Sequence, residues 1–445
     1  MSTRVAERTR GFTREAVEEL SHLLDEPAWL RERRLAAWEI YERTPMPSRT
    51  DEEWRRTDIR RLPIDRVVPF AGVGQRVSGP DVLPSALFEI LGDAALRSGL
   101  LVQVDSSVVY TQLDPQLAAE GVVFTDLLTA ARDMPELLQR VFMTEAVRPE
   151  DNKFAALHGA FWSGGTFLYV PEGVEVALPL RSFVWAETPG TAIFAHTLLV
   201  AEPGASVVLI DTWASPTVEE PLIASNVVEI ITGEGAQVRY IQLQDWGRSV
   251  WNFTTQRALL RQDVTVNTLN VSLGSRLSKA FIASNLVGPG ATAEMLGLYF
   301  ADDAQHLDHQ TRQWHVAPYA SSDLLYKGAL KDRARTVFSG LIKVFPQAQR
   351  TDAYQANRNL ILSPTARADT IPNLEIGAND VRCTHGATVG QVEEEYIFYL
   401  MSRGISRPEA VKLIVDGFFD EVIERVPVTE VQETVRAAIA RKIGL

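Results

Sequence analysis

The sequence is poor in cysteine. Among 445 residues there is one, Cys383. One thiol cannot form an intrachain disulfide, and it cannot supply the four thiolates of an all-cysteine zinc or iron–sulfur site. Any metal chemistry at Cys383 would therefore need ligands from another molecule.

Long apolar runs and an excess of basic charge are also lacking. The first eight residues contain no apolar stretch typical of a secretory signal, and no run approaches the roughly 18 apolar residues that span a bilayer. The 44 Lys and Arg residues are outnumbered by 57 Asp and Glu, a net charge of −13, which argues against nonspecific nucleic-acid binding. We expect a soluble, cytoplasmic protein without nucleic-acid or membrane partners.

The motifs of self-sufficient enzymes are missing as well. There is no G-x-x-x-x-G-K-[ST] phosphate-binding loop, no G-x-S-x-G elbow and no H-E-x-x-H. Gly233-x-Gly235 lacks the third glycine of a dinucleotide-binding fingerprint. The sequence therefore predicts a chain that binds no nucleotide and is not an enzyme.

The first third of the chain has helical signals. Helical spacing begins at Thr13 and again at Pro27, and Thr50 and Glu53 have the spacing of a capping box. Residues 82–150 mix short apolar strands with helical stretches, typical of a small α+β lobe. We assign residues 1–150 to an N-terminal helical and α+β region. Three tryptophans are expected to pack between its short helices: Trp29, Trp38 and Trp54.

From about residue 160 the pattern changes to short β-branched and aromatic runs separated by turns. Aligned turns have Gly173, Gly204, Gly235, Asp263 and Gly290 as their third residues, at intervals of 31, 31, 28 and 27. Units this small cannot bury their own apolar face and must stack. An interval near 30 favours a parallel β-helix over a propeller, whose blades need ~40–45 residues, and over an Ig-like sandwich, with turns every ~8–12. We assign residues 151–390 to this core, whose open end requires a cap or a partner.

Helices return after residue 390. Glu393–Ser402 reads as a helix with Gly404 just beyond it, and capping boxes at Ser406–Glu409 and Thr429–Gln432 open two more. Residues 391–445 therefore form a C-terminal helical region. The fold class expected is mainly β with helical ends.

Cys383 and His385 are the sharpest candidate site. If the stack continues through them as a strand, they point to the same face. A thiolate beside an imidazole suits iron or zinc, and an imidazolium neighbour would favour the thiolate. The alternative is a buried cysteine and a hydrogen-bonded histidine at the last turn, and spacing alone leaves both open.

Two further clusters have ordinary structural interpretations. His306 and His309 would point to opposite faces of a strand, while His309 and His315 would agree, so we expect hydrogen bonding along the stack and not a three-histidine metal site. Glu393, Glu394 and Glu395 could suggest carboxylate chemistry, but acidic residues in a first helical turn also complement the helix dipole.

Several motifs, in order, resemble the SufB/SufD family of iron–sulfur cluster assembly scaffolds. The resemblance runs from about residue 150 to 425, with weaker matches at Glu26–Leu30 and Trp54–Thr57. Its motifs are Asp308-His309-Gln310-Thr311, Tyr326-Lys327-Gly328-Ala329-Leu330, Ala348–Gln355, Asn357-Arg358-Asn359-Leu360, Cys383-Thr384-His385-Gly386-Ala387-Thr388-Val389-Gly390 and Phe398–Ile405.

The resemblance implies a right-handed parallel β-helix flanked by helical regions. It also implies a complex with SufB and two copies of the ABC ATPase SufC, which would dock on the C-terminal helices. Sulfur-delivery proteins would act through SufB. The single cysteine and the Cys-x-His-Gly-Ala-Thr-Val-Gly segment look more like SufD than SufB, whose chains are usually richer in cysteine.

The resemblance further implies that a transient iron–sulfur cluster or iron ion is held where SufB and SufD meet. His385 matches the histidine placed there as a ligand, and Cys383 matches the nearby cysteine; whether a flavin takes part stays open. The alternatives are a SufB-type or self-paired homodimeric scaffold and, more remotely, a β-helix polysaccharide lyase or hydrolase.

Overall fold

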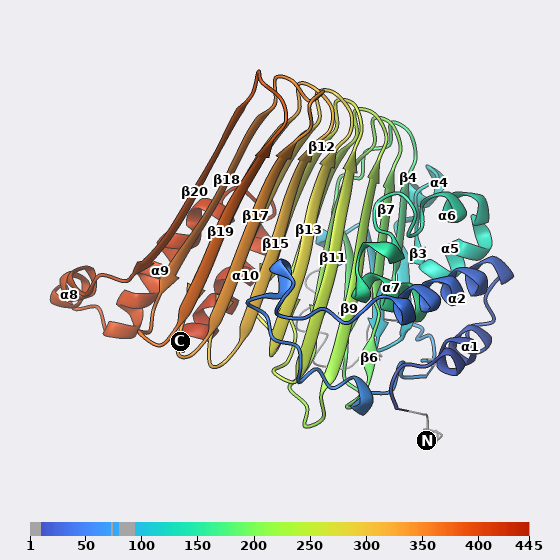
Figure 1. Ribbon diagram of the computed structural model, residues 1–445, viewed down its shortest axis with the longest axis horizontal. Helices are drawn as coiled ribbons and strands as arrows, with labels where there is room; N and C mark the ends of the chain where they lie inside the picture. The colour runs from blue at the N-terminus through green and yellow to red at the C-terminus, as the bar shows by residue number, and fades with distance from the viewer. Residues whose placement is uncertain (1–9, 73, 80–93, 445) are drawn as a thin grey trace.

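The computed structural model describes residues 10–72, 74–79 and 94–444. Its body is a stack of two long β-sheets that the chain enters alternately (Figure 1). From β7 onward, each strand pairs in parallel with the strand one coil earlier, which makes the body a parallel β-helix, with helices before and after it. The fold class expected from the repeat is confirmed. The first eight residues and residues 82–93, on which two of the expectations rest, lie outside the described residues.

One sheet contains, in spatial order, β2 (Ser107–Leu113), β1 (Gly99–Val104), β5 (Leu180–Trp185), β8 (Ser206–Ala214), β10 (Gln237–Asp245), β12 (Thr265–Ser272), β14 (Thr292–Ala301), β16 (Ser321–Leu330), β18 (Asp352–Ile361) and β20 (Arg382–Gln391). We call it the even sheet. The odd sheet contains β19 (Arg367–Ile376), β17 (Arg335–Val344), β15 (His306–His315), β13 (Leu277–Leu286), β11 (Val250–Leu260), β9 (Leu222–Thr232), β7 (His196–Ala201), β4 (Thr166–Val170) and β3 (Val123–Asp126), while β6 (Ala192–Ile193) pairs with β9.

The sequence repeat corresponds to the turn from the odd sheet into the even sheet. The third residue of each aligned turn has a left-handed backbone, with φ of 69°, 69°, 68°, 55° and 72° at Gly173, Gly204, Gly235, Asp263 and Gly290. Glycine adopts this conformation without a steric cost, and aspartate tolerates it. In the next two turns Tyr319 and Arg350 take the same place, with φ of 60° and 58°. The repeat fades from the sequence there although the structure continues.

The interior of the β-helix contains ordered polar groups as well as apolar ones. Asn226 donates to the side-chain oxygen of Asn252, and Asn252 donates to Ser278, each over 2.9 Å, so that one side chain per coil links successive turns. Asp211 is fully buried, and its carboxylate accepts hydrogen bonds from Thr197, Trp213 and Tyr240. Because their hydrogen bonds are made internally, these groups can be buried without a large penalty.

The N-terminal region is not a separate lobe, contrary to the pattern of residues 82–150. β1 pairs in parallel with β5, and β3 pairs antiparallel with β4, so these strands extend both sheets. Leu100, Leu101 and Val102 of β1 are fully buried in this continuation. The helices beside it are α1 (Arg14–Leu23), α2 (Ala28–Arg43), α4 (Pro115–Ala119), α5 (Leu127–Asp133), α6 (Pro135–Val141) and α7 (Lys153–Phe161).

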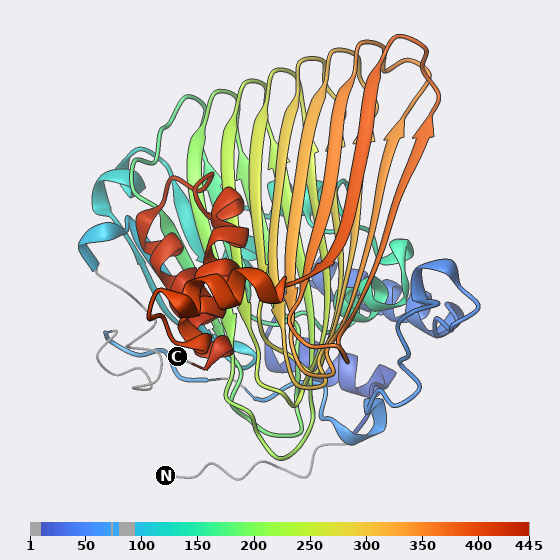
Figure 2. The same cartoon turned by 90° about the vertical axis from the view of Figure 1, so that its left-hand side faces the viewer.

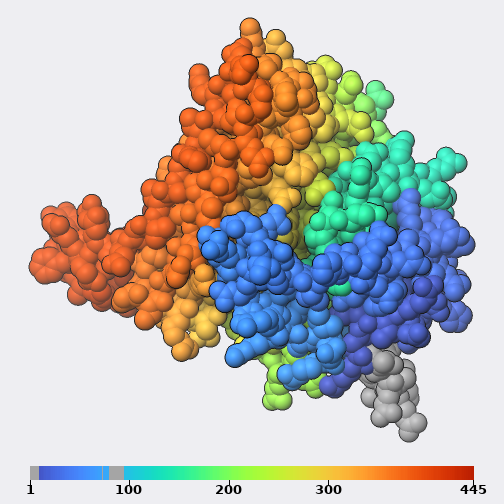
Figure 3. All heavy atoms as spheres, viewed as in Figure 1, coloured from blue at the N-terminus to red at the C-terminus, as the bar shows by residue number. Residues whose placement is uncertain are grey.

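Residues 52–57, which we call the strap, cross the outer face of the odd sheet (Figures 1 and 3). Thr13 caps α1 as expected, but the capping box expected at Thr50 and Glu53 is wrong, because Glu52–Trp54 is only a short 3₁₀ turn after Asp51. Trp54 packs on aromatic rings of α7 and of the sheet and not between short helices.

Three helices end the chain: α8 (Glu394–Ser402), α9 (Arg407–Ile423) and α10 (Thr429–Ile443). The capping box of Ser406 and Glu409 is present. The box expected at Thr429 is wrong, because α10 starts after Val428 without a side-chain cap. α9 and α10 pack on the outer face of the even sheet (Figure 2). No helix within the described ranges has both the length and the apolar character needed to cross a membrane.

Candidate functional site at the open end of the stack

The β-helix ends in an uncovered turn. β19 and β20 are the last strands of their sheets, and each pairs with only one strand in the part of the chain that the structure describes. Side chains that would be inside an ordinary turn are exposed here: Leu374 to 37%, Ile376 to 41% and Val389 to 48%. Pro372 lies within β19, a position that edge strands tolerate because proline lacks a backbone N–H. The end therefore has two free strand edges, and inward-facing apolar side chains of the last turn are exposed to solvent.

Cys383 and His385 both lie in β20 and share its inner face. Their partners on β18 are Ala353 and Gln355, which are 1% exposed and point into the stack. The conditional prediction that the pair points to one face is confirmed. Cys383 packs beside the apolar cluster at the corner of the last turns, whereas His385 is exposed to solvent.

The environment of Cys383 favours the thiol over the thiolate. Burial raises the pKa of Cys383, and the nearby Asp352 carboxylate raises it further. The expected promotion of the thiolate by its histidine neighbour is therefore not what these surroundings produce. A cation near Cys383 would be needed to displace the proton. Within the described residues no group of three or more His, Cys, Asp and Glu side chains could hold a metal ion.

The other histidines of the sequence analysis do not converge. His306 points to the outer face, and His309 and His315 point inward, as strand alternation predicts. Burial lowers the pKa of each to about 4, so all three are neutral. Each accepts or donates one hydrogen bond, of 2.8–3.0 Å, with a hydroxyl group; these belong to Thr57, Ser272 and Ser322, respectively. The interpretation as hydrogen-bonding residues of the stack is confirmed.

Glu393–Glu395 belong to the start of α8. Glu393 is its N-cap, and Glu394 forms an ion pair with Arg407 of α9 over 2.6 Å. These contacts agree with the interpretation of the acidic residues as the start of a helix and not as a site of carboxylate chemistry. α8 itself projects from the body (Figures 1 and 3) and exposes aromatic side chains: Tyr396 to 58%, Phe398 to 73% and Tyr399 to 56%.

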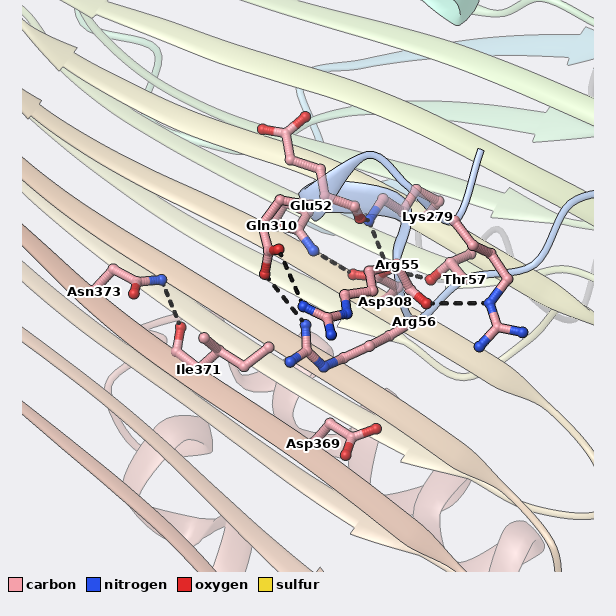
Figure 4. A network of polar contacts seen from close by, with 12 residues as sticks. Glu52, Arg55, Arg56, Thr57, Lys279, Asp308, Gln310, Asp369, Ile371 and Asn373 are labelled. Atoms are coloured by element: carbon pink, nitrogen blue, oxygen red, sulfur yellow. Dashed lines mark hydrogen bonds and ion pairs between the residues drawn. The ribbon is translucent and has the colours of Figure 1, made fainter. Parts of the chain in front are cut away.

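Sequence reasoning missed the network that fastens the strap (Figure 4). Lys279 and Asp308 are paired in register on β13 and β15, and their fully buried side chains form an ion pair of 2.6 Å. Lys279 also donates to the backbone carbonyl of Glu53, and Thr57 donates to Asp308. The sequence does contain the two opposite charges of this ion pair, on strands one coil apart. They can be recognised as a pair only when the register of the two strands is known.

It also missed a buried chain of three titratable groups beneath the N-terminal helices. Nε2 of His158 lies 3.1 Å from Nδ1 of His196, and Nε2 of His196 lies 3.1 Å from the carboxylate of Glu229. Backbone N–H groups of Met143 and Val147 donate to the same carboxylate over 2.8 and 3.0 Å. Burial raises the pKa of Glu229 to about 8 and lowers that of His196 to about 3. At neutral pH these three side chains are therefore uncharged.

Comparison with known proteins agrees with the fold and with the motifs. Residues 183–418 match the model of the SUF system FeS cluster assembly SufBD core domain, and residues 17–181 match that of the SufBD protein N-terminal region. The iron-sulfur cluster assembly protein SufB of Bacillus subtilis is 32% identical over 426 residues, which cover 94% of this chain and 90% of that protein. An iron-sulfur cluster assembly SufBD family protein of Staphylococcus saprophyticus has the same identity and coverage. This chain therefore belongs to the SufBD family of iron–sulfur cluster assembly proteins.

Proposed function

We propose that this chain is the SufD-like scaffold subunit of a cluster assembly complex, paired with SufB and carrying SufC. The observation that carries the proposal is the open last turn. Two free edges of ten residues require a partner strand, and the lumen between them contains Cys383 and His385. Since an iron–sulfur cluster needs about four ligands, two from this chain leave two for the partner.

Within the family, the SufD-like role rests on the single cysteine and on the segment around His385. The names of the relatives support a second candidate, a SufB-type or self-paired scaffold. Co-purification with SufB and SufC, followed by native mass spectrometry, separates the two. A SufD-like chain gives one copy per SufB with two copies of SufC. A complex that contains this chain twice and no SufB would contradict the proposal.

SufC is proposed to dock on the C-terminal helices, and the exposed aromatic face of α8 is the strongest support. Exposed aromatic side chains are typical hot spots of protein interfaces. The double substitution of Phe398 and Tyr399 to Ala is expected to abolish retention of SufC on the tagged chain. Tyr319→Ala removes an equally exposed aromatic residue (60%) from a turn of the stack and is the control. Retention of SufC by the double variant would contradict docking on the aromatic side chains of α8.

The chain acts without catalysis of its own in this proposal. ATP binding by the two SufC subunits brings them together, shifts the paired ends of the two stacks and exposes Cys383 and His385 to iron and sulfur, which are the substrates of assembly. His385→Ala is expected to abolish cluster formation on the purified complex, measured by visible absorption and iron content. Thr384→Ala, a change on the opposite face of β20, is the control. Full cluster yield from His385→Ala would contradict the assignment.

A further inference from the structure

The lumen of the last turn contains more polar groups than Cys383 and His385. Gln355 lies directly beneath His385 in the register of β18 and β20 and is only 1% exposed. On the opposite sheet, Thr370 of β19 pairs with the inward-pointing Phe338 and so points into the same lumen. Side chains from both sheets therefore point into the lumen that His385 also faces.

The amide of Gln355 reaches across the lumen. Its nitrogen lies 3.3 Å from the backbone carbonyl oxygens of Gly340 and Asn373, which belong to β17 and β19. Gly340 provides the space, because a Cβ at this position would lie 2.4 Å from the Gln355 amide oxygen. The amide thus forms the floor of the open turn.

Two oxygen atoms of this floor have no hydrogen-bond partner among the described residues. They are the side-chain oxygens of Gln355 and Thr370, and both are buried. A buried acceptor without a partner is destabilising, and a donor that arrives with a ligand or with water removes this penalty. A divalent iron ion keeps bound water where protein ligands are few, and that water supplies O–H donors. Groups that fix the ligands of a metal from outside its first shell commonly change its affinity 10- to 100-fold.

We propose that Gln355 and Thr370 are positioning residues of the site: their oxygens accept hydrogen bonds from water bound to a divalent metal ion at His385. The inference rests on the proposed function for the nature of the ion. It extends the chain's contribution from two side chains on one strand to four side chains that come from both sheets and from the floor between them.

The test is a titration of the full-length chain with Co²⁺, a visible substitute for Fe²⁺, monitored by its absorption. Gln355→Met and Thr370→Val remove the acceptors at nearly constant volume, and each is expected to weaken binding at least about tenfold. Gln355→Glu keeps an acceptor but cannot donate to the two carbonyls; it is expected to bind Co²⁺ at least as tightly as the wild type. Thr384→Val, on the outer face of β20, is the control and is expected to change nothing.

If Gln355 had only a structural role, the two Gln355 variants would rank differently in Co²⁺ affinity and in stability. The ionised Gln355→Glu would then be at least as damaging as Gln355→Met, both in Co²⁺ affinity and in the urea midpoint, and that result would overturn the proposal. Unchanged Co²⁺ affinity in both Gln355→Met and Thr370→Val would also overturn the proposal. If Gln355→Met does not fold, Thr370→Val alone provides this test. If the wild type does not bind Co²⁺, or His385→Ala binds it equally well, the inference fails, while SufB pairing and SufC retention still test the scaffold role independently.

Discussion

Glu229 provides a quantitative test of the buried chain that it forms with His196 and His158. We predict that Glu229→Gln flattens the pH dependence of stability above neutrality. The folded protein holds the carboxyl proton up to about pH 8, whereas the unfolded chain releases it near 4.5. Folding therefore becomes less favourable as the pH rises through this window, because the proton is bound more tightly in the folded state.

The magnitude follows from the two pKa values. At one pKa unit per 1.36 kcal/mol, the full penalty is about 5 kcal/mol, of which about 2 kcal/mol accumulates between pH 6.5 and 8.5. His196 has a folded pKa of about 3, so its contribution is lost as the pH falls below 6.5 and leaves this range untouched. The other charges near Glu229 are those of Arg33, Arg257 and Asp151.

In Glu229→Gln the amide replaces the neutral acid, but its NH₂ cannot accept from the Met143 N–H. The variant is therefore expected to be about 1–3 kcal/mol less stable at pH 6.5 and to approach the wild type at pH 8.5. Urea denaturation followed by tryptophan fluorescence at both pH values measures the difference. Glu145, a partly exposed carboxylate, lies between Met143 and Val147, whose N–H groups donate to Glu229. Glu145→Gln is expected to keep the wild-type slope. Equal slopes for Glu229→Gln and the wild type would refute the assignment of a buried neutral acid.

The remaining predictions concern the strap and two glycines. Lys279→Met leaves the Asp308 carboxylate buried without its cation and should cost about 3–5 kcal/mol in urea denaturation, with faster proteolysis at the strap; slow cleavage would mean that the ion pair is not what fastens it. Gly328→Ala places a Cβ 1.9 Å from the Tyr299 ring and should destabilise by about 1–3 kcal/mol. Gly417→Ala, with no atom within 4 Å in α9, should instead raise the melting temperature, by the equivalent of about 0.5–1 kcal/mol.

The sequence predicts the β-helix because its turn chemistry is local. A glycine or aspartate occurs at the left-handed position once in each coil. This repeat can be recognised in the sequence without knowledge of which strands pair. The same reasoning fails where tertiary contacts determine the backbone conformation or the start of a helix. Tyr319 and Arg350 occupy the left-handed position against their preference, and Thr429 has the right spacing for a cap while α10 starts one residue earlier.

The candidate site was predictable only in part, for the same reason. Cys383 and His385 are two apart in one strand, so alternation alone puts them on one face. Gln355 and Thr370 reach the same lumen from strands 30 and 15 residues away, and no local pattern connects them. The direction of the Cys383 pKa shift was also hidden, because it depends on how the last corner packs and on Asp352, a residue of the previous coil.

Pro372 has a consequence for how the open end chooses its neighbours. A long free strand edge can pair with many extended peptides. At Pro372 such a peptide finds no amide hydrogen and a fixed backbone angle, so generic cross-β growth is interrupted halfway along β19. A strand that pairs along the whole of β19 therefore has to leave out the hydrogen bond at Pro372, which restricts the segments that fit this edge.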